Sequence, residues 1–213
     1  MTELVRLIRE GASVDALGDY LDALPSTRRE EEVTTLRRRE QAELFDIAAD
    51  AAPIRLGHFV PEAAPPLRPV HHAGRNTIAT LAHFQRFQKR FARPTEGADR
   101  LIGYNASNAW FIKPGYFVAY ETDGRDEWER RGGVVVDYHQ IPGGDVPRGW
   151  PDVVPNSQGL QRLVYLNTRD FMRRVSTHVS IGRASREDAK GDLLLDYWFT
   201  LCRRERDSST ENE

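Results

Sequence analysis

The 213-residue sequence has a single cysteine, Cys202, which excludes a disulfide within the chain and a zinc site built from several cysteines. Long hydrophobic runs are also missing, since no segment approaches the ~20 apolar residues that a membrane-spanning helix needs. Residues 1–11 contain no apolar stretch of signal-peptide length. We therefore expect a cytoplasmic protein without disulfides that makes no membrane contact.

The familiar motifs of cofactor and catalytic sites are absent from the sequence as well. It contains no G-x-G-x-x-G or P-loop, no G-x-S-x-G and no H-E-x-x-H. His71 and His72 are adjacent, and adjacent side chains on an extended chain point in opposite directions. These observations argue against a nucleotide cofactor, a serine hydrolase and a metal site, so we expect no cofactor and no metal.

Charge is close to balanced overall, with a formal net charge of −2, but it is unevenly distributed. Residues 1–50 hold twelve acidic and seven basic side chains, whereas residues 68–93 hold six basic side chains and no acid. The basic segment is either a surface for an anionic partner or a partner for the acidic helices within the fold. The balanced total gives no general attraction to nucleic acid.

The first fifty residues have the apolar spacing of helices. A helix is predicted over 2–10, and Ser13 is placed to cap a second one. Thr27 and Glu30 have the spacing of a capping box at the start of a longer helix over 28–50. Helices therefore form the predicted N-terminal region, residues 1–52.

Residues 53–75 form a predicted proline-rich connector, with five prolines between 53 and 69. Proline fixes φ and removes an amide donor, so an extended path is expected. Apolar residues interspersed among the prolines indicate that the connector is held against a surface; they are Ile54, Leu56, Phe59, Val60 and Leu67.

A further helix is predicted over 77–92, with Asn76 as its cap. The phenylalanines of "HFQRFQKRF" are spaced by three and four, which favours a helix over a strand. Because these rings would share one helical face, core packing is favoured over stacking on nucleic acid bases, which argues against nucleic acid as a partner.

From residue 100 the pattern is that of β-structure, with β-branched and aromatic residues between turn signals. The predicted strands are 115–122, 133–141, 162–169, 173–182 and 192–202, with one or two short strands over 101–113. Strands that follow one another without intervening helices favour an antiparallel meander. The predicted fold class is α+β, with N-terminal helices packed on a curved sheet or small lipocalin-like barrel.

The remaining segments complete the predicted domain organisation. A helix and the antiparallel sheet make up residues 76–204, and the polar tail 205–213 is expected to be disordered. The segment 142–159 is rich in proline and glycine, and Trp150 within it predicts a loop folded over the protein surface.

The last two predicted strands, 173–182 and 192–202, can be paired as a hairpin centred near Asp188. That register gives one apolar face, and it places His178 opposite Trp198 and Ser180 opposite Asp196. The second face is poor in charge, so it is either the wall of a ligand cavity or a solvent-facing sheet surface with unusually little charge. Its predicted ligand-binding residues, with those of neighbouring strands, are Trp198, Tyr165, Tyr138, Asp137, Arg162, Arg174, Ser176, Ser180 and Thr200.

A histidine beside a carboxylate is the usual arrangement of a general base, so His178 and Asp196 are the candidate catalytic pair. The first hypothesis is a small-molecule-binding barrel with an aromatic, partly apolar pocket, and an anionic ligand would be met by Arg162 or Arg174. Consecutive strands with aromatic faces resemble the pattern of lipocalin-like and fatty-acid-binding-like barrels.

Two alternatives stay open from the sequence. One is a cofactor-independent isomerase, cyclase or lyase on the same scaffold, with His178 as acid and base. The other is a protein-interaction module that uses the acidic helices or the basic segments. The sequence also leaves a homo-oligomer open.

Overall fold

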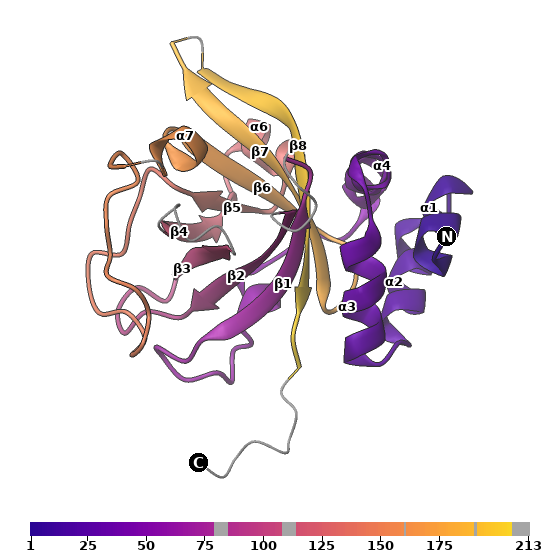
Figure 1. Cartoon of the computed structure of the whole chain (residues 1–213), viewed down its shortest axis with the longest axis horizontal. Coiled ribbons are helices and arrows are strands. Elements are labelled where there is room, and N and C mark those ends of the chain that lie inside the picture. The colour runs from indigo at the N-terminus through magenta and orange to yellow at the C-terminus, as the bar shows by residue number, and fades with distance from the viewer. Residues whose placement is uncertain (79–84, 108–113, 160, 190, 206–213) are drawn as a thin grey trace.

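The computed structural model describes residues 1–78, 85–107, 114–159, 161–189 and 191–205 (Figure 1). The helices are α1 (Glu3–Arg9), α2 (Val14–Asp22), α3 (Ser26–Thr35), α4 (Arg38–Ile47), the 3₁₀ turn η1 (Ala48–Asp50), α5 (Leu56–Phe59), α6 (Asp126–Arg131) and α7 (Arg162–Tyr165). The strands are β1 (Val70–Asn76), β2 (Arg86–Ala92), β3 (Arg100–Ser107), β4 (Gly115–Glu121), β5 (Val134–Asp137), β6 (Thr168–Arg174), β7 (Val179–Asp188) and β8 (Gly191–Arg203).

Each strand pairs antiparallel with the next, and β8 returns to pair with β1, so the eight strands close into one barrel. The predicted fold class, N-terminal helices on a C-terminal antiparallel barrel, is confirmed. Closure gives each described strand two neighbours, so the barrel lacks the two terminal edge strands that an open sheet would have.

The interior of the barrel contains the larger aromatic core. Rings from β2, β4 and β8 fill it, and residues of the connector close one end. Phe59 of the connector lies against Phe91 at 4.8 Å and His72 at 5.8 Å between ring centroids. Ile54, Leu56, Phe59 and Val60 are all buried there, so the predicted attachment of the connector through these residues is confirmed.

A second core lies outside the barrel, between its wall and the N-terminal helices. In Figure 1, α1 to α4 cover one side of the barrel next to β1 and β8. Val179, Ile181 and Cys202 point outward into this core and are almost fully buried. Part of the apolar face predicted for 173–182 is therefore buried, but it packs against the N-terminal helices and not in the barrel interior.

The N-terminal helices agree with the prediction at Ser13 and differ from it over residues 26–50. Ser13 caps α2 by accepting the amide of Ala16 at 3.3 Å, as predicted. The single helix over 28–50 is wrong, because buried Leu36 leaves the helical conformation, with φ −59° and ψ 127°, and separates α3 from α4. The capping box is also wrong, since α3 already begins at Ser26, after Pro25.

The helix predicted over 77–92 is wrong wherever the structure describes it. Residues 70–76 and 86–92 are strands β1 and β2, and residues 79–84 lie outside the described part. In β2, alternation directs Phe87, Lys89 and Phe91 into the barrel. Pairing with β1 and β3 satisfies the backbone here, and this long-range contact overrides the local spacing of the phenylalanines.

Two predicted strands are also displaced. Residues 162–165 form the short helix α7, and the strand starts at Thr168. The segment 173–182 spans the end of β6, a turn at 175–178 and the start of β7, so His178 lies in a turn.

The hairpin of β7 and β8 consequently has a different register from the predicted one. Val179 pairs with Cys202 and Ile181 with Thr200, and a bulge between Arg183 and Ser185 shifts the pairing toward the tip. Neither His178 with Trp198 nor Ser180 with Asp196 is a cross-strand pair, and Ser180 faces Leu201 instead.

The long loop after β5 folds back over the outer face of β3 and β4. The ring of Trp150 lies 4.9 Å from that of Tyr104, and Asn156 donates to the carbonyl of Tyr116 at 2.7 Å. The prediction that this loop covers part of the protein is confirmed. The tail 206–213 lies outside the described residues.

Interior glycines create space for the aromatic rings. A Cβ on Gly103 would lie 2.3 Å from the ring of Phe117 and 2.4 Å from the carbonyl oxygen of Arg90. Because that carbonyl belongs to the neighbouring strand, it cannot move without disturbing the barrel. We expect Gly103→Ala to lower the free energy of unfolding by ~1–3 kcal/mol in urea denaturation. Gly143→Ala, where a Cβ meets nothing within 4 Å, is the matched control and should change little. Equal stability of the two variants would contradict this packing.

Candidate functional site

Four polar side chains meet inside the barrel, surrounded by aromatic rings. Lys89 Nζ donates to Asp170 Oδ2 at 2.8 Å and to the Tyr138 hydroxyl at 2.7 Å. The same hydroxyl accepts from Asn105 Nδ2 at 2.7 Å and donates to Asp170 at 3.2 Å. These side chains come from β2, β3 and β6 and from the residue after β5, and only barrel closure brings them together.

Aromatic faces surround the ammonium group of Lys89. Its Nζ lies 4.6 Å from the ring centroid of Phe199 and 5.0 Å from that of Phe117. Tyr165, carried by α7, stacks on Tyr138 with centroids 5.1 Å apart and an interplanar angle of 22°. Such faces stabilise a cation, but they do not replace the water that Lys89 loses on burial.

Burial dominates the protonation equilibria of this network. It lowers the pKa of Lys89, and the charge of Asp170 acts in the opposite direction. Burial also raises the pKa of Tyr138 well above its ordinary value, with the nearby Asp170 carboxylate as the next contribution. Tyr138 therefore stays a neutral phenol, able to donate to Asp170 over the whole physiological range.

The network retains one unused hydrogen-bonding atom. The Tyr138 hydroxyl accepts from Lys89 and donates to Asp170, so only the NH₂ group of Asn105 can face it. This fixes the amide orientation and leaves Asn105 Oδ1 buried without a hydrogen-bond partner. A buried acceptor without a partner is costly and suits a ligand that brings an O–H or N–H group.

Two aromatic rings near this network keep some access to solvent. Phe87 and Tyr197 pack around Phe199, with centroids 5.9 and 6.2 Å from it, and both are only half-buried. Burial among neighbouring protein atoms nevertheless raises the pKa of Tyr197 well above its ordinary value. Phe87 and Tyr197 are thus inward-facing rings that remain partly exposed to solvent on this side of Lys89.

At the end closed by the connector, the interior contains the fully buried His72. Its Nε2 lies 3.0 Å from the carbonyl oxygen of Phe59, so Nε2 carries the proton, and Nδ1 has no partner. Burial lowers the pKa of His72 to about 3, and the bond to Phe59 opposes this only in part. His72 is thus neutral at ordinary pH and serves the packing of this end.

The candidate catalytic pair is not assembled in the structure. His178 Nε2 lies 2.9 Å from Glu205 Oε1, and Arg203 reaches the other ring nitrogen at 3.3 Å. Asp196 is exposed on β8, and its nearest ion-pair partners are Arg38 and Arg183, at 3.5 and 3.6 Å. The predicted contact of His178 with Asp196 is wrong because the chain turns at 175–178.

Of the other residues predicted on the same face, one points inward. Ser180 lies opposite interior Leu201, and its hydroxyl has no partner. Ser176 accepts the amides of His178 and Val179 and stabilises the turn. Trp198 and Thr200 face the N-terminal helices, where the Thr200 hydroxyl donates to the carbonyl of Val33 at 3.4 Å.

The remaining predicted ligand residues divide between interior and exterior. Tyr138 and Tyr165 lie inside the barrel, beside Lys89. Asp137 instead points outward, where it accepts from the Tyr120 hydroxyl at 2.8 Å. Arg162 and Arg174 are exposed, so neither reaches the interior network.

Lys89, Asp170 and Asn105 are the residues that the sequence prediction missed. The signal was present in "FQKRF", since a strand over 86–92 puts Lys89 between two inward phenylalanines. Asp170 and Asn105 carry no such local signal, because their neighbours belong to distant strands.

Comparison with known proteins gives no match: no family model, no curated protein and no solved structure is significantly similar to the chain. Within the described ranges, no three His, Cys, Asp or Glu side chains are grouped to hold a metal ion. The helices of that part of the chain are all too short or too polar to cross a membrane. Geometry alone therefore has to indicate the function.

The ion pair of Lys89 and Asp170 can be tested by charge removal. Lys89→Met leaves a buried carboxylate without its counter-charge, so we expect it to cost ~3–5 kcal/mol of unfolding free energy in urea denaturation. The double variant K89M/D170N removes both charges and should recover most of that loss. Arg100→Met, which breaks only an exposed pair with Asp99, is the surface control. A double variant as unstable as K89M would contradict a coupled pair.

Burial of neutral His72 predicts acid sensitivity. Its pKa is about 3 in the folded protein and 6.5 as the ordinary value, so the unfolded chain binds the extra proton between these limits. The contribution of His72 to the free energy of unfolding is complete above pH 6.5. Below this pH it decreases by up to ~1.4 kcal/mol per pH unit. His72→Gln keeps a donor for Phe59 and should remove this part of the slope measured by urea denaturation from pH 7 to 4.5. His139→Gln, at an exposed position outside the barrel interior, is the surface control for replacing an imidazole by an amide.

Proposed function

We propose that this protein binds a small, partly apolar molecule inside its barrel, on the side of Lys89 where Phe87 and Tyr197 keep access to solvent. Closed barrels with aromatic interiors and a few polar groups are a general architecture for small-molecule binding. The observation that carries the proposal is Asn105 Oδ1, a buried acceptor left without a partner inside an aromatic interior.

The same geometry narrows the chemistry of the ligand. The charge of Lys89 is already matched by Asp170 at 2.8 Å, so Lys89 offers no free positive charge to an anionic group. An uncharged molecule with an aromatic or aliphatic body and one hydroxyl or N–H group fits the rings and the acceptor of Asn105. The anionic ligand considered from the sequence is not favoured for the interior.

The experiment uses the neutral fluorophore N-phenyl-1-naphthylamine, which has an apolar body and one N–H group, with the full-length protein. We expect saturable one-to-one binding with a blue-shifted emission. Phe87→Asp introduces a charge among the rings and should weaken the affinity at least tenfold, because the desolvation of a carboxylate opposes ligand entry. Leu193→Asp, an exposed apolar residue at the tip of the β7–β8 hairpin, is the matched control and should bind like the wild type.

Circular dichroism and thermal unfolding establish whether each variant is folded. If Phe87→Asp does not fold, Tyr197→Asp tests the same set of rings from β8. Absence of saturable binding to the wild type, or equal affinity of the Phe87, Tyr197 and Leu193 variants, would overturn the proposal.

A further inference from the structure

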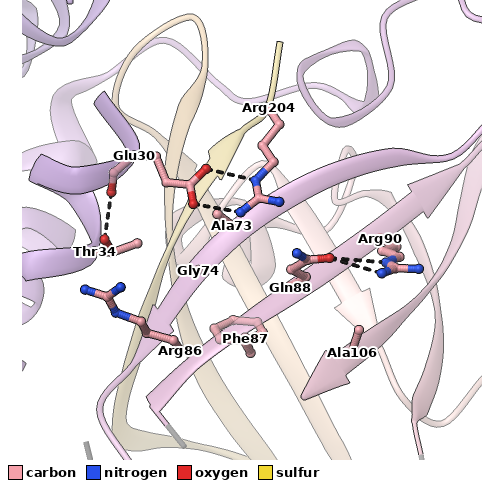
Figure 2. A pocket seen from close by; sticks show the side chains of 10 residues that line it. All are labelled: Glu30, Thr34, Ala73, Gly74, Arg86, Phe87, Gln88, Arg90, Ala106 and Arg204. Atoms are coloured by element: carbon pink, nitrogen blue, oxygen red, sulfur yellow. Dashed lines mark hydrogen bonds and ion pairs between the residues drawn. The ribbon is translucent and has the colours of Figure 1, made fainter. Parts of the chain in front are cut away.

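A separate pocket lies on the outside of the barrel, between α3 and the outer faces of β1, β2 and β3 (Figure 2). Its volume is about 440 Å³, within the range of small-molecule sites. The lining residues are Glu30, Thr34, Ala73, Gly74, Arg86, Phe87, Gln88, Arg90, Ala106 and Arg204. Small side chains from β1 and β3 leave room over the strands, and most of the polar groups around them are hydrogen-bond donors.

Arg86 has no counter-charge here. It lies directly opposite Arg75 in the pairing of β1 with β2, and like charges at opposed positions destabilise a sheet. Arg75 is satisfied by the carbonyl of Thr34 at 3.0 Å, at the C-terminal end of α3, and by Gln85 Oε1 at 3.0 Å. Arg86 is exposed and has no hydrogen bond or ion pair with any residue in the described ranges, and Figure 2 shows its guanidinium on the α3 side of the pocket, beside Thr34.

Gln88 is oriented by its neighbour Arg90. Arg90 donates through Nε and Nη2 to Gln88 Oε1 at 3.3 and 3.2 Å, and its Nη1 donates to the Tyr104 hydroxyl at 2.9 Å. Because a guanidinium can only donate, the oxygen of Gln88 must face Arg90. The NH₂ group of Gln88 then points the other way, into the pocket, as Figure 2 shows.

Arg204 contributes the third donor. Its Nε and Nη2 hold both oxygens of Glu30, at 2.9 and 2.8 Å. This bidentate pair fixes the guanidinium and raises its pKa, and it leaves Nη1 unused. Glu30 neutralises Arg204, so the net positive charge of the pocket comes from Arg86 and Arg90.

We propose that this pocket binds the phosphate group of a small organic molecule through Arg86, Gln88 and Arg204. The three donors come from different positions around Ala73, which suits the several oxygens of a tetrahedral anion better than a planar carboxylate. The bound anion would also offset the repulsion between Arg75 and Arg86. The pocket shares Phe87 with the rings around Phe199, but its polar groups are outward-facing donors, whereas the interior polar network leaves the acceptor Asn105 Oδ1 unused.

The test is a calorimetric titration of the full-length protein with inorganic phosphate and with phenyl phosphate at constant ionic strength. We expect one saturable site for each, with weaker or no binding of acetate. Arg86→Gln should weaken phosphate binding about tenfold. Arg148→Gln removes the same charge from an exposed arginine outside the pocket and should leave the affinity unchanged.

Stability and the other site provide independent readouts. Thermal unfolding without phosphate should show Arg86→Gln to be at least as stable as the wild type, because the opposed positive pair is removed. Its binding of N-phenyl-1-naphthylamine should be unchanged, so that failure at one site is distinguishable from failure at the other. Equal loss of phosphate affinity in both arginine variants, or no saturable phosphate site in the wild type, would overturn the inference.

Discussion

Hydrogen bonding between β8 and β1 closes the sheet, and both hydrophobic cores form around this closure. It turns an eight-stranded meander into a closed barrel with a defined inside and outside. Lys89 and Asp170 are 81 residues apart on strands that are not neighbours, so they meet only across the enclosed space. The same closure gives the N-terminal helices a continuous outer wall for a second core.

Closure also explains why the buried charges of the interior network need several hydrogen bonds. Burying a lysine and an aspartate costs more free energy than their attraction returns unless further hydrogen bonds satisfy both groups. Tyr138 supplies those bonds by accepting from Lys89 and donating to Asp170. Asn105 completes the network through its NH₂ group, and its side-chain oxygen Oδ1 is left without a hydrogen-bond partner.

The two pockets differ in the chemistry that they present. The interior combines aromatic area with a free acceptor, whereas the pocket beside α3 combines small side chains with free donors and positive charge. The basic segment 68–93 contributes to both, because alternate residues of β2 point to opposite faces. Lys89 points inward and is neutralised, while Arg86 and Arg90 point outward. The basic residues of segment 68–93 thus serve two different sites, one inside the barrel and one on its outer surface.

Local periodicity and composition were enough to predict the fold class, the β-structure after residue 100, the cap at Ser13 and the apolar attachment of the connector. Local spacing could not decide between helix and strand in "HFQRFQKRF", because its phenylalanines fit a helical period and its alternation also fits a strand. The turn at 175–178 interrupts a segment whose alternation continues without a break, and the bulge after Arg183 shifts the register. The contacts of Lys89 with Asp170 and of His178 with Glu205 could not be predicted locally, because each depends on the pairing of strands or segments far apart in the chain.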